Sequence, residues 1–190
     1  FVLETGVLQA VDAVAGFAKQ LKSQAVVFAA AQDFVPSKKT KPQLKEFIKH
    51  VAKRVPHAVL DLPGWSNKEL RAVVGTAPVH IAFDPLEEQP DVKSLAYLRL
   101  PGPSGYRSRY DAAALERVVE YCEASSAKHT FVAFRNIDRY ENARTVMGDL
   151  RVALEKVARG PVDPLGAGRT DAGVHGWGQV VSLDLPDNTD

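Results

Sequence analysis

The residues best suited to chemistry lie in one glycine-rich stretch, Gly166–Gln179, which reads GAGRTDAGVHGWGQ. Its five glycines permit backbone angles closed to other residues and let a bulky ligand approach the main chain. Asp171 sits inside this bend, and Arg169 is close enough in sequence to pair with its carboxylate and keep it ionised. A fixed, ionised carboxylate beside small residues suits nucleophilic attack on a sugar carbon or stabilisation of a cationic one. The plainer alternative is a structural turn closed by an Arg–Asp pair.

Two basic groups elsewhere in the chain could bind a polyanion. The first is a set of lysines repeating every four residues, which would line one stripe of a helix. The second is a set of arginines accompanied by two tyrosines, whose rings could stack on unpaired bases. The lysine stripe is Lys41, Lys45 and Lys49; the arginines are Arg107, Arg109, Arg135, Arg139 and Arg144, and the tyrosines are Tyr106 and Tyr110. Phosphate contacts from these candidate RNA-binding residues would make binding steeply salt-dependent. For the lysine stripe, a solvated helix face is the alternative.

The elements that must position these groups are helices and short apolar strands in alternation. Ser66 with Glu69, and Thr40 with Gln43, have the spacing of capping boxes, and Asp111 can begin another helix. Besides these three helices, the sequence predicts helices over Leu8–Leu21 and from about Asn142 to Arg159, and strands over Ala25–Ala31, His57–Leu62, Val79–Phe83, Ser94–Leu100, Thr130–Phe134 and Gln179–Leu185.

The first five of these strands are continuous apolar runs rather than alternating ones. Strands of this kind are typical of a parallel sheet covered on both faces. Helices separate most of them, which indicates a βα-repeating layout. The predicted fold class is therefore α/β with a parallel βα-repeat sheet.

Bulk properties favour a globular, intracellular protein. The chain has 190 residues, of which 45% are hydrophobic and 25% charged, and its formal net charge is +1. This charge balance neither requires nor excludes a polyanionic partner, because a basic face can lie within a neutral total. The single cysteine, Cys122, cannot form an internal disulfide and fits a reducing compartment. With no apolar run long enough to span a bilayer, we expect a soluble protein that is cytoplasmic or organellar and not secreted, without a membrane partner.

The C-terminal segment resembles the first part of the TruA-type tRNA pseudouridine synthases. The residues that carry this resemblance are R-T-V-x-G-x-L at Arg144–Leu150, A-G-R-T-D-A-G-V-H at Ala167–His175 and G-Q-V at Gly178–Val180, in the order and at about the spacing of the family. The resemblance implies isomerisation of uridine to pseudouridine in tRNA, with Asp171 as the catalytic nucleophile and Arg169, Thr170 and His175 as substrate-binding neighbours. It implies no metal and no organic cofactor.

The residues before this segment resemble the YecE-like family of unknown function, whose members have a TIM-barrel-like fold. The likeness is carried by short matches in order: Val26–Phe34, Leu60–Trp65, His80–Pro85, Tyr97–Gly102, Tyr106–Tyr110 and Phe134–Tyr140. In such barrels functional groups stand at the carboxyl ends of strands. The corresponding candidates here are Asp61, Asp84, Arg99 and Asn136, with Tyr106, Arg109 and Tyr110 in a nearby loop. Arg–Asp pairing that merely closes the barrel rim is the structural alternative.

Together the two resemblances predict a fusion-derived chain. Residues 1–142 would form a partial YecE-like, TIM-barrel-type domain, and residues 143–190 a TruA-like helix–loop–strand segment that bears the catalytic-loop motif. We expect tRNA or another structured RNA as the partner, and a homodimer or larger complex that completes the fold. The alternative function is a non-catalytic RNA-binding or assembly scaffold that retains the motif.

Overall fold

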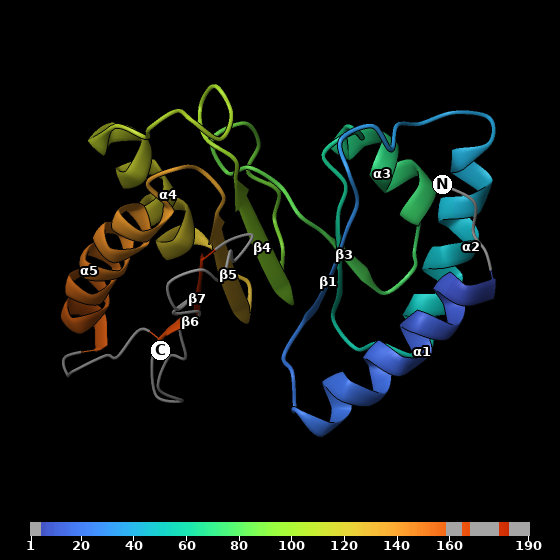
Figure 1. Cartoon of the computed structure of the whole chain (residues 1–190). Coiled ribbons are helices and arrows are strands. Elements are labelled where there is room, and N and C mark those ends of the chain that lie inside the picture. Colours follow the sequence, from blue (N-terminus) through green and yellow to red (C-terminus); the bar gives the residue numbers. More distant parts are fainter. Residues whose placement is uncertain (1–4, 159–164, 168–178, 183–190) are drawn as a thin grey trace. The chain divides into compact units, whose positions relative to one another are not determined.

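The chain folds into two compact units, Phe1–Ala82 and Phe83–Asp190, which we call unit 1 and unit 2 (Figure 1). The structure is a computed structural model and describes residues 5–158, 165–167 and 179–182. Each unit combines helices with a small sheet, so the predicted α/β class is confirmed. In the described residues no helix is both long and apolar enough to cross a membrane.

Unit 1 is a parallel three-stranded sheet with its helices interleaved along the chain. The elements are α1 (Thr5–Gln20), β1 (Val26–Ala29), α2 (Thr40–Ala52), β2 (Ala58–Asp61), α3 (Asn67–Val74) and β3 (Val79–Ile81). The strands lie in the order β1-β2-β3, which is also their order in the sequence. The central strand β2 is fully buried, and Leu60 packs with Leu44 and Ile48 of α2 and Leu70 of α3.

Two helix starts in unit 1 show how local side chains set element boundaries. The capping box of α3 is confirmed: Glu69 N donates to Ser66 Oγ at 3.3 Å, and Ser66 N donates to the Glu69 carboxylate at 3.3 Å. The capping box expected at Thr40 is wrong, because the Thr40 hydroxyl donates to the Val35 carbonyl instead. Ser37 Oγ accepts from the Thr40 amide at 3.0 Å and so satisfies the first turn of α2.

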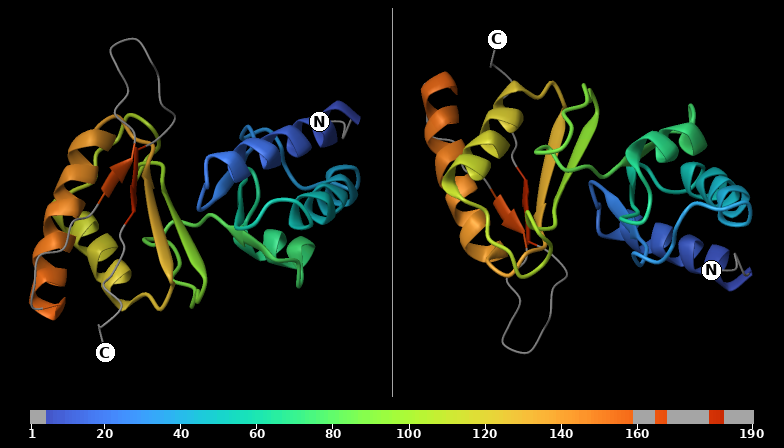
Figure 2. Two further views of the ribbon diagram at one scale, coloured as in Figure 1. Left: turned by 90° about the horizontal axis from the view of Figure 1, so that it is seen from below. Right: turned by 90° about the horizontal axis from the view of Figure 1, so that it is seen from above.

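Unit 2 is a four-stranded mixed sheet whose one face is covered by two helices (Figure 2). Its elements are β4 (Leu95–Leu100), α4 (Ala112–Ala124), β5 (His129–Phe134), α5 (Arg139–Ala158), β6 (Leu165–Ala167) and β7 (Gln179–Ser182). The strand order is β4-β5-β7-β6. Beneath α4 and α5 the core is formed by buried apolar residues that include Leu98, Leu100, Val118, Phe134 and Val146.

The sheet of unit 2 departs from the all-parallel expectation at its C-terminal end. β4 and β5 are parallel, as predicted, but β7 is antiparallel to both β5 and β6. The strand predicted at Gln179–Leu185 is confirmed over Gln179–Ser182, whereas β6 was not predicted. The predicted domain boundary at 142/143 falls inside α5, which is one continuous helix.

Candidate functional site

The segment that bears the catalytic-loop motif leaves and re-enters the sheet of unit 2 at one edge. β6 ends at Ala167, whose partner in β7 is Val180. Val180 also pairs with Ala133 of β5, and Gln179 pairs with Phe134 at the end of β5. Residues 168–178 therefore connect two strand ends that lie beside the carboxyl end of β5.

The four residues to which the sequence assigns chemistry all belong to that connection. Asp171, the expected nucleophile, and Arg169, Thr170 and His175, its expected substrate-binding neighbours, lie outside the described residues. Their roles stay predictions. The described residues that lie at the same sheet edge follow β4 and β5 in the sequence.

Two further loops leave that same edge. β4 and β5 are parallel with Leu100 opposite Phe134, so both strands end together. β4 is followed by the loop Pro101–Tyr110, and β5 by the short connection Arg135–Asp138, which leads into α5. Three features therefore lie at this edge: the post-β4 loop, the start of α5, and the strand ends Ala167 and Gln179, which flank the motif segment, residues 168–178.

Buried polar side chains fix the post-β4 loop to the start of α5. Asn136 is fully buried; its Nδ2 donates to the Ser108 carbonyl at 3.1 Å, and its Oδ1 accepts from Asn142 Nδ2 at 3.1 Å. Tyr110 is also buried, and its hydroxyl accepts from the Gly102 amide at 2.7 Å. Burial raises the pKa of Tyr110, which keeps the phenol protonated. Tyr110 is therefore a structural residue, and its expected role in stacking is wrong.

Two other tyrosines at this edge are open to solvent. Tyr106 is 55% exposed in the post-β4 loop, and Tyr140 is 60% exposed in the first turn of α5. The Tyr106 carbonyl accepts from the Ile137 amide at 2.7 Å, and Arg139 Nη1 lies 3.5 Å from the Tyr106 hydroxyl. Sequence reasoning missed Tyr140, although the i, i+4 spacing from Tyr140 to Arg144 was a readable signal.

Arginines surround these two rings. Arg144 lies over the Tyr140 ring, with Cζ 5.9 Å from the ring centroid. Arg109 pairs with Asp138 at 2.9 Å, and its side chain remains 77% exposed. Arg107 is exposed and makes no ion pair within the described part of the chain. The expected RNA-binding arginines thus lie together with two aromatic faces at one sheet edge.

The lysine stripe lies elsewhere, on α2 of unit 1. Lys41 Nζ is 3.9 Å from a Glu69 carboxylate oxygen, and Lys49 Nζ is 3.3 Å from one of Glu46. Lys45 is exposed. Because two of the three lysines face carboxylates at the surface, this arrangement favours the solvated helix face over an anion site.

The acidic candidates at the strand ends are divided between the units. Asp61 ends β2 in unit 1 and is fully buried. Asp84 lies in unit 2, where its Oδ1 accepts from the Leu86 amide at 2.9 Å and burial raises the pKa of its carboxyl. Arg99 of β4 opposes that shift by its positive charge. A buried Asp84 that interacts electrostatically with Arg99 fits the structural alternative, in which Arg and Asp side chains pair without a catalytic role.

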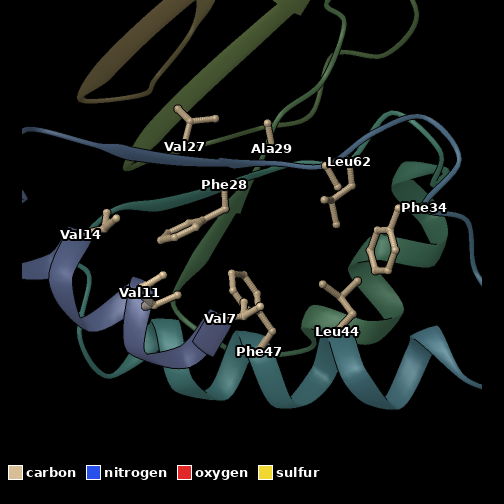
Figure 3. A pocket seen from close by; sticks show the side chains of 12 residues that line it. Val7, Val11, Val14, Val27, Phe28, Ala29, Phe34, Leu44, Phe47 and Leu62 are labelled. Carbon is tan, nitrogen blue, oxygen red and sulfur yellow. The ribbon is translucent and has the colours of Figure 1, made fainter. Parts of the chain in front are cut away.

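Unit 1 also contains an apolar pocket of about 330 Å³ between α1, β1 and α2. Figure 3 shows Phe28 directed from β1 towards Val11 and Phe47, whereas Val27 and Ala29 point to the other side of the strand. Such a volume would admit a small ligand. Every described residue that lines it has an apolar side chain, so no polar side chain among them could orient a reacting molecule.

Two titratable features lie away from the sheet edge. His57 Nδ1 and His80 Nε2 are 3.4 Å apart in unit 1, and burial together with the charge of His57 lowers the pKa of His80. In unit 2, burial raises the pKa of the Cys122 thiol to about 12. Such a thiol is protonated at neutral pH and is a poor nucleophile.

Comparison with known proteins finds relatives that are similar to part of the chain. The chain is similar to tRNA pseudouridine synthase A of Fervidobacterium nodosum, with 57% identity over 47 residues, which are 25% of this chain and 19% of the relative. The corresponding enzyme of Leuconostoc mesenteroides is 49% identical over 53 residues (26% and 21%), and that of Streptococcus thermophilus 45% over 58 residues (30% and 23%). The chain spans about a fifth of the length of these curated relatives.

The remaining comparisons add little to this. No family model matches the chain. Two solved structures align with it at 13% identity: the methyltransferase domain of bacterial CtHen1, with a TM-score of 0.39 over 93% of this chain and 98% of that one, and the 23S rRNA methyltransferase ErmE, with a TM-score of 0.40 over 82% and 71%. Scores this low carry no argument about fold or function. About a quarter of the chain is thus similar in sequence to tRNA pseudouridine synthase A, as the motif had indicated.

Proposed function

We propose that the chain contributes the nucleophile-bearing segment of a tRNA pseudouridine synthase. The observation that carries the proposal is the 45–57% identity to enzymes named tRNA pseudouridine synthase A over 46–58 residues. In this reaction the Asp171 carboxylate attacks the ribosyl–uracil unit and the glycosidic bond to nitrogen breaks. The uracil turns and rejoins the sugar through a ring carbon as the bond to the carboxylate breaks; that carbon loses its proton and the freed ring nitrogen gains one. The reaction is an isomerisation, so no atom is gained or lost and no cofactor is required.

The described part of unit 2 supports this assignment by its geometry. The strands that flank the motif segment end at a sheet edge that also presents exposed tyrosines and arginines. Such side chains bind RNA by stacking on bases and by contacting phosphates. A base stacked in RNA must be extruded before a carboxylate can reach its sugar carbon. We infer that Arg169 holds Asp171 ionised, and that Thr170 and His175 bind the extruded nucleotide.

For the remainder of the chain we propose a scaffold derived from a partial YecE-like, TIM-barrel-type domain over residues 1–142. The parallel strands β1–β3 and β4–β5 lie in sequence order within their sheets, which supports a βα-repeat of this kind. Because positioning and charge stabilisation supply most of an enzyme's acceleration, we expect full turnover to need a partner, either a second copy or a larger complex.

Pseudouridine formation on an unmodified tRNA transcript tests the proposal. We expect product from the parent chain and none from Asp171→Ala or Asp171→Asn, with both variants still binding the tRNA. Ser182→Ala, a small change on β7 outside the motif, is the matched control and should behave as the parent. Equal product from the parent and Asp171→Ala, including none from either, would remove the catalytic claim for this chain.

The second candidate function is a non-catalytic RNA-binding scaffold, and the exposed aromatic and basic groups of unit 2 favour it equally. It predicts salt-dependent binding of tRNA with no pseudouridine formed under any condition. Binding with Asp171-dependent product would exclude it.

A further inference from the structure

We propose that Tyr106 and Tyr140, with Arg107, Arg109 and Arg144, form a docking face for unpaired RNA nucleotides at the carboxyl-end edge of the unit 2 sheet. The inference rests on the proposed RNA substrate but not on turnover. It assigns substrate recognition to residues that precede or only begin the segment similar to pseudouridine synthases.

The two aromatic rings are the first reason. The rings of Tyr106 and Tyr140 are more than half exposed, so their faces are open to a stacking partner. Tyr106 and Tyr140 come from different elements, the post-β4 loop and α5. The loop is joined to the start of α5 because the Ile137 amide donates to the Tyr106 carbonyl and Arg139 Nη1 lies 3.5 Å from the Tyr106 hydroxyl. Every base has a π-face, so such rings bind unpaired nucleotides without regard to sequence.

The rigidity of the loop is the second reason. Gly102 and Gly105 adopt φ angles of 102° and 90°, and the Ser108 hydroxyl donates to the Gly105 carbonyl at 2.6 Å. Asn136, fully buried, ties the Ser108 carbonyl to the start of α5. A loop closed this tightly holds Tyr106 in place before RNA arrives, so little conformational entropy is lost on binding.

The charge around the rings is the third reason. Arg107 and Arg109 flank the Tyr106 loop on either side of Ser108, and Arg144 lies over the Tyr140 ring. Guanidinium groups are suited to phosphate oxygens by their planar donor geometry and also stack on bases. Asp138 and Glu141 pair with Arg109 and Arg144 at 2.9 and 4.0 Å, and the exposure of both arginines lets phosphates compete for them.

The place of this face relative to the motif segment completes the argument. β5 ends at Phe134 opposite Gln179, the first residue of β7, so the connection into α5 and the return of the motif segment start side by side. The docking face therefore lies at the same end of the sheet as Gln179, where β7 begins. Unpaired nucleotides beside an extruded base have lost a stacking partner, and exposed rings can replace it.

Fluorescence anisotropy with two labelled RNAs tests the proposal: a hairpin with an unpaired loop, and a fully paired duplex. We expect Tyr106→Ala and Tyr140→Ala each to weaken hairpin binding by about 5-fold to 100-fold while duplex binding changes by less than about twofold. Tyr140→Phe should bind as the parent, because it keeps the ring. Arg107→Gln should reduce the slope of log affinity against log salt by about 0.7.

Two matched controls separate this face from general effects. Phe17→Ala removes an aromatic ring that is 64% exposed in unit 1, and Arg151→Ala removes an exposed arginine further along α5; both should bind as the parent. Parent-like hairpin binding by Tyr106→Ala and Tyr140→Ala would overturn the docking face, as would an equal loss on hairpin and duplex. Pseudouridine formation that depends on Asp171 would survive that result, so the two proposals fail separately.

Discussion

Three glycine-to-alanine changes in unit 2 should have different effects on stability although the chemical change is the same. At Gly102 the added Cβ would overlap the Gly105 carbonyl oxygen and lie 2.7 Å from Ser108 Oγ, at a φ of 102°. At Gly105 the φ is 90° but the added Cβ meets nothing within 4 Å. At Gly148, inside α5, the Cβ also meets nothing within 4 Å and the backbone is helical.

The magnitudes follow from these environments. A positive φ costs an alanine about 1–2 kcal/mol, so Gly105→Ala should lower the free energy of unfolding by that amount. Gly102→Ala adds an overlap that the loop cannot relieve, since the Gly105 oxygen is held by the Ser108 hydroxyl and amide. Overpacking of this kind costs about 1–3 kcal/mol more. Gly148→Ala should instead raise the free energy of unfolding by about 0.5–1 kcal/mol through helix propensity.

Urea unfolding followed by circular dichroism measures all three changes against the parent. The restriction that alanine places on the unfolded chain is common to the three variants and cancels in their comparison. The expected order of stability is Gly148→Ala, parent, Gly105→Ala, Gly102→Ala. Equal midpoints for Gly102→Ala and Gly105→Ala would refute the closely packed turn, and a destabilising Gly148→Ala would refute the open helical environment.

Three further predictions concern single groups. The pKa of His80 is lowered in the folded chain, so its contribution to stability is present above the unfolded pKa of about 6.5 and is lost as pH falls through the folded pKa. The urea midpoint of unit 1 should therefore fall with acidification in the parent, and less steeply in His80→Gln. Trp65 fluorescence in a Trp177→Phe background measures this midpoint. The Cys122 thiol, with its pKa at about 12, should react with an aromatic disulfide at pH 8 at least about 100-fold more slowly in the folded chain than in denaturant, and similar rates in both states would show that the thiol is open. Ser66→Ala should lower the free energy of unfolding by about 1 kcal/mol through loss of the α3 capping box. Ser23→Ala, at an exposed position outside the helices of unit 1, should change it little. A cap that contributes nothing would leave both variants at the parent's urea midpoint.

Local signals account for most of what could be predicted of the fold. The continuous apolar strands, the Ser66 capping box and the Asp111 N-cap act through neighbours in the sequence, and each is found as predicted. α5 begins at Arg139, three residues before the expected Asn142, and Asn142 in its first turn bonds to buried Asn136, a tertiary contact that no local pattern reveals. β6 carries no apolar run that a pattern could detect, and its direction is set by pairing with β7.

The site was predictable only in part, for a different physical reason. The motif fixes residue types and order, so the resemblance to pseudouridine synthases could be read from the sequence and the comparison confirms it. Which tyrosines face solvent is decided by tertiary packing. Tyr110 turns inward to bind the Gly102 amide, while Tyr140 stays outside, although both sit in similar basic contexts.

The continuity of α5 has a practical consequence for dividing the chain. Its first turn bonds to Asn136 in the scaffold, while Val146 and Leu150, further along, pack in the same core as β4 and β5. An expression fragment cut at 142/143 would divide α5 and separate Val146 and Leu150 from the core residues of β4 and β5. A fragment that starts at Phe83 keeps α5 intact, and with it the packing of this helix, which carries Tyr140, against the sheet that contains β6 and β7.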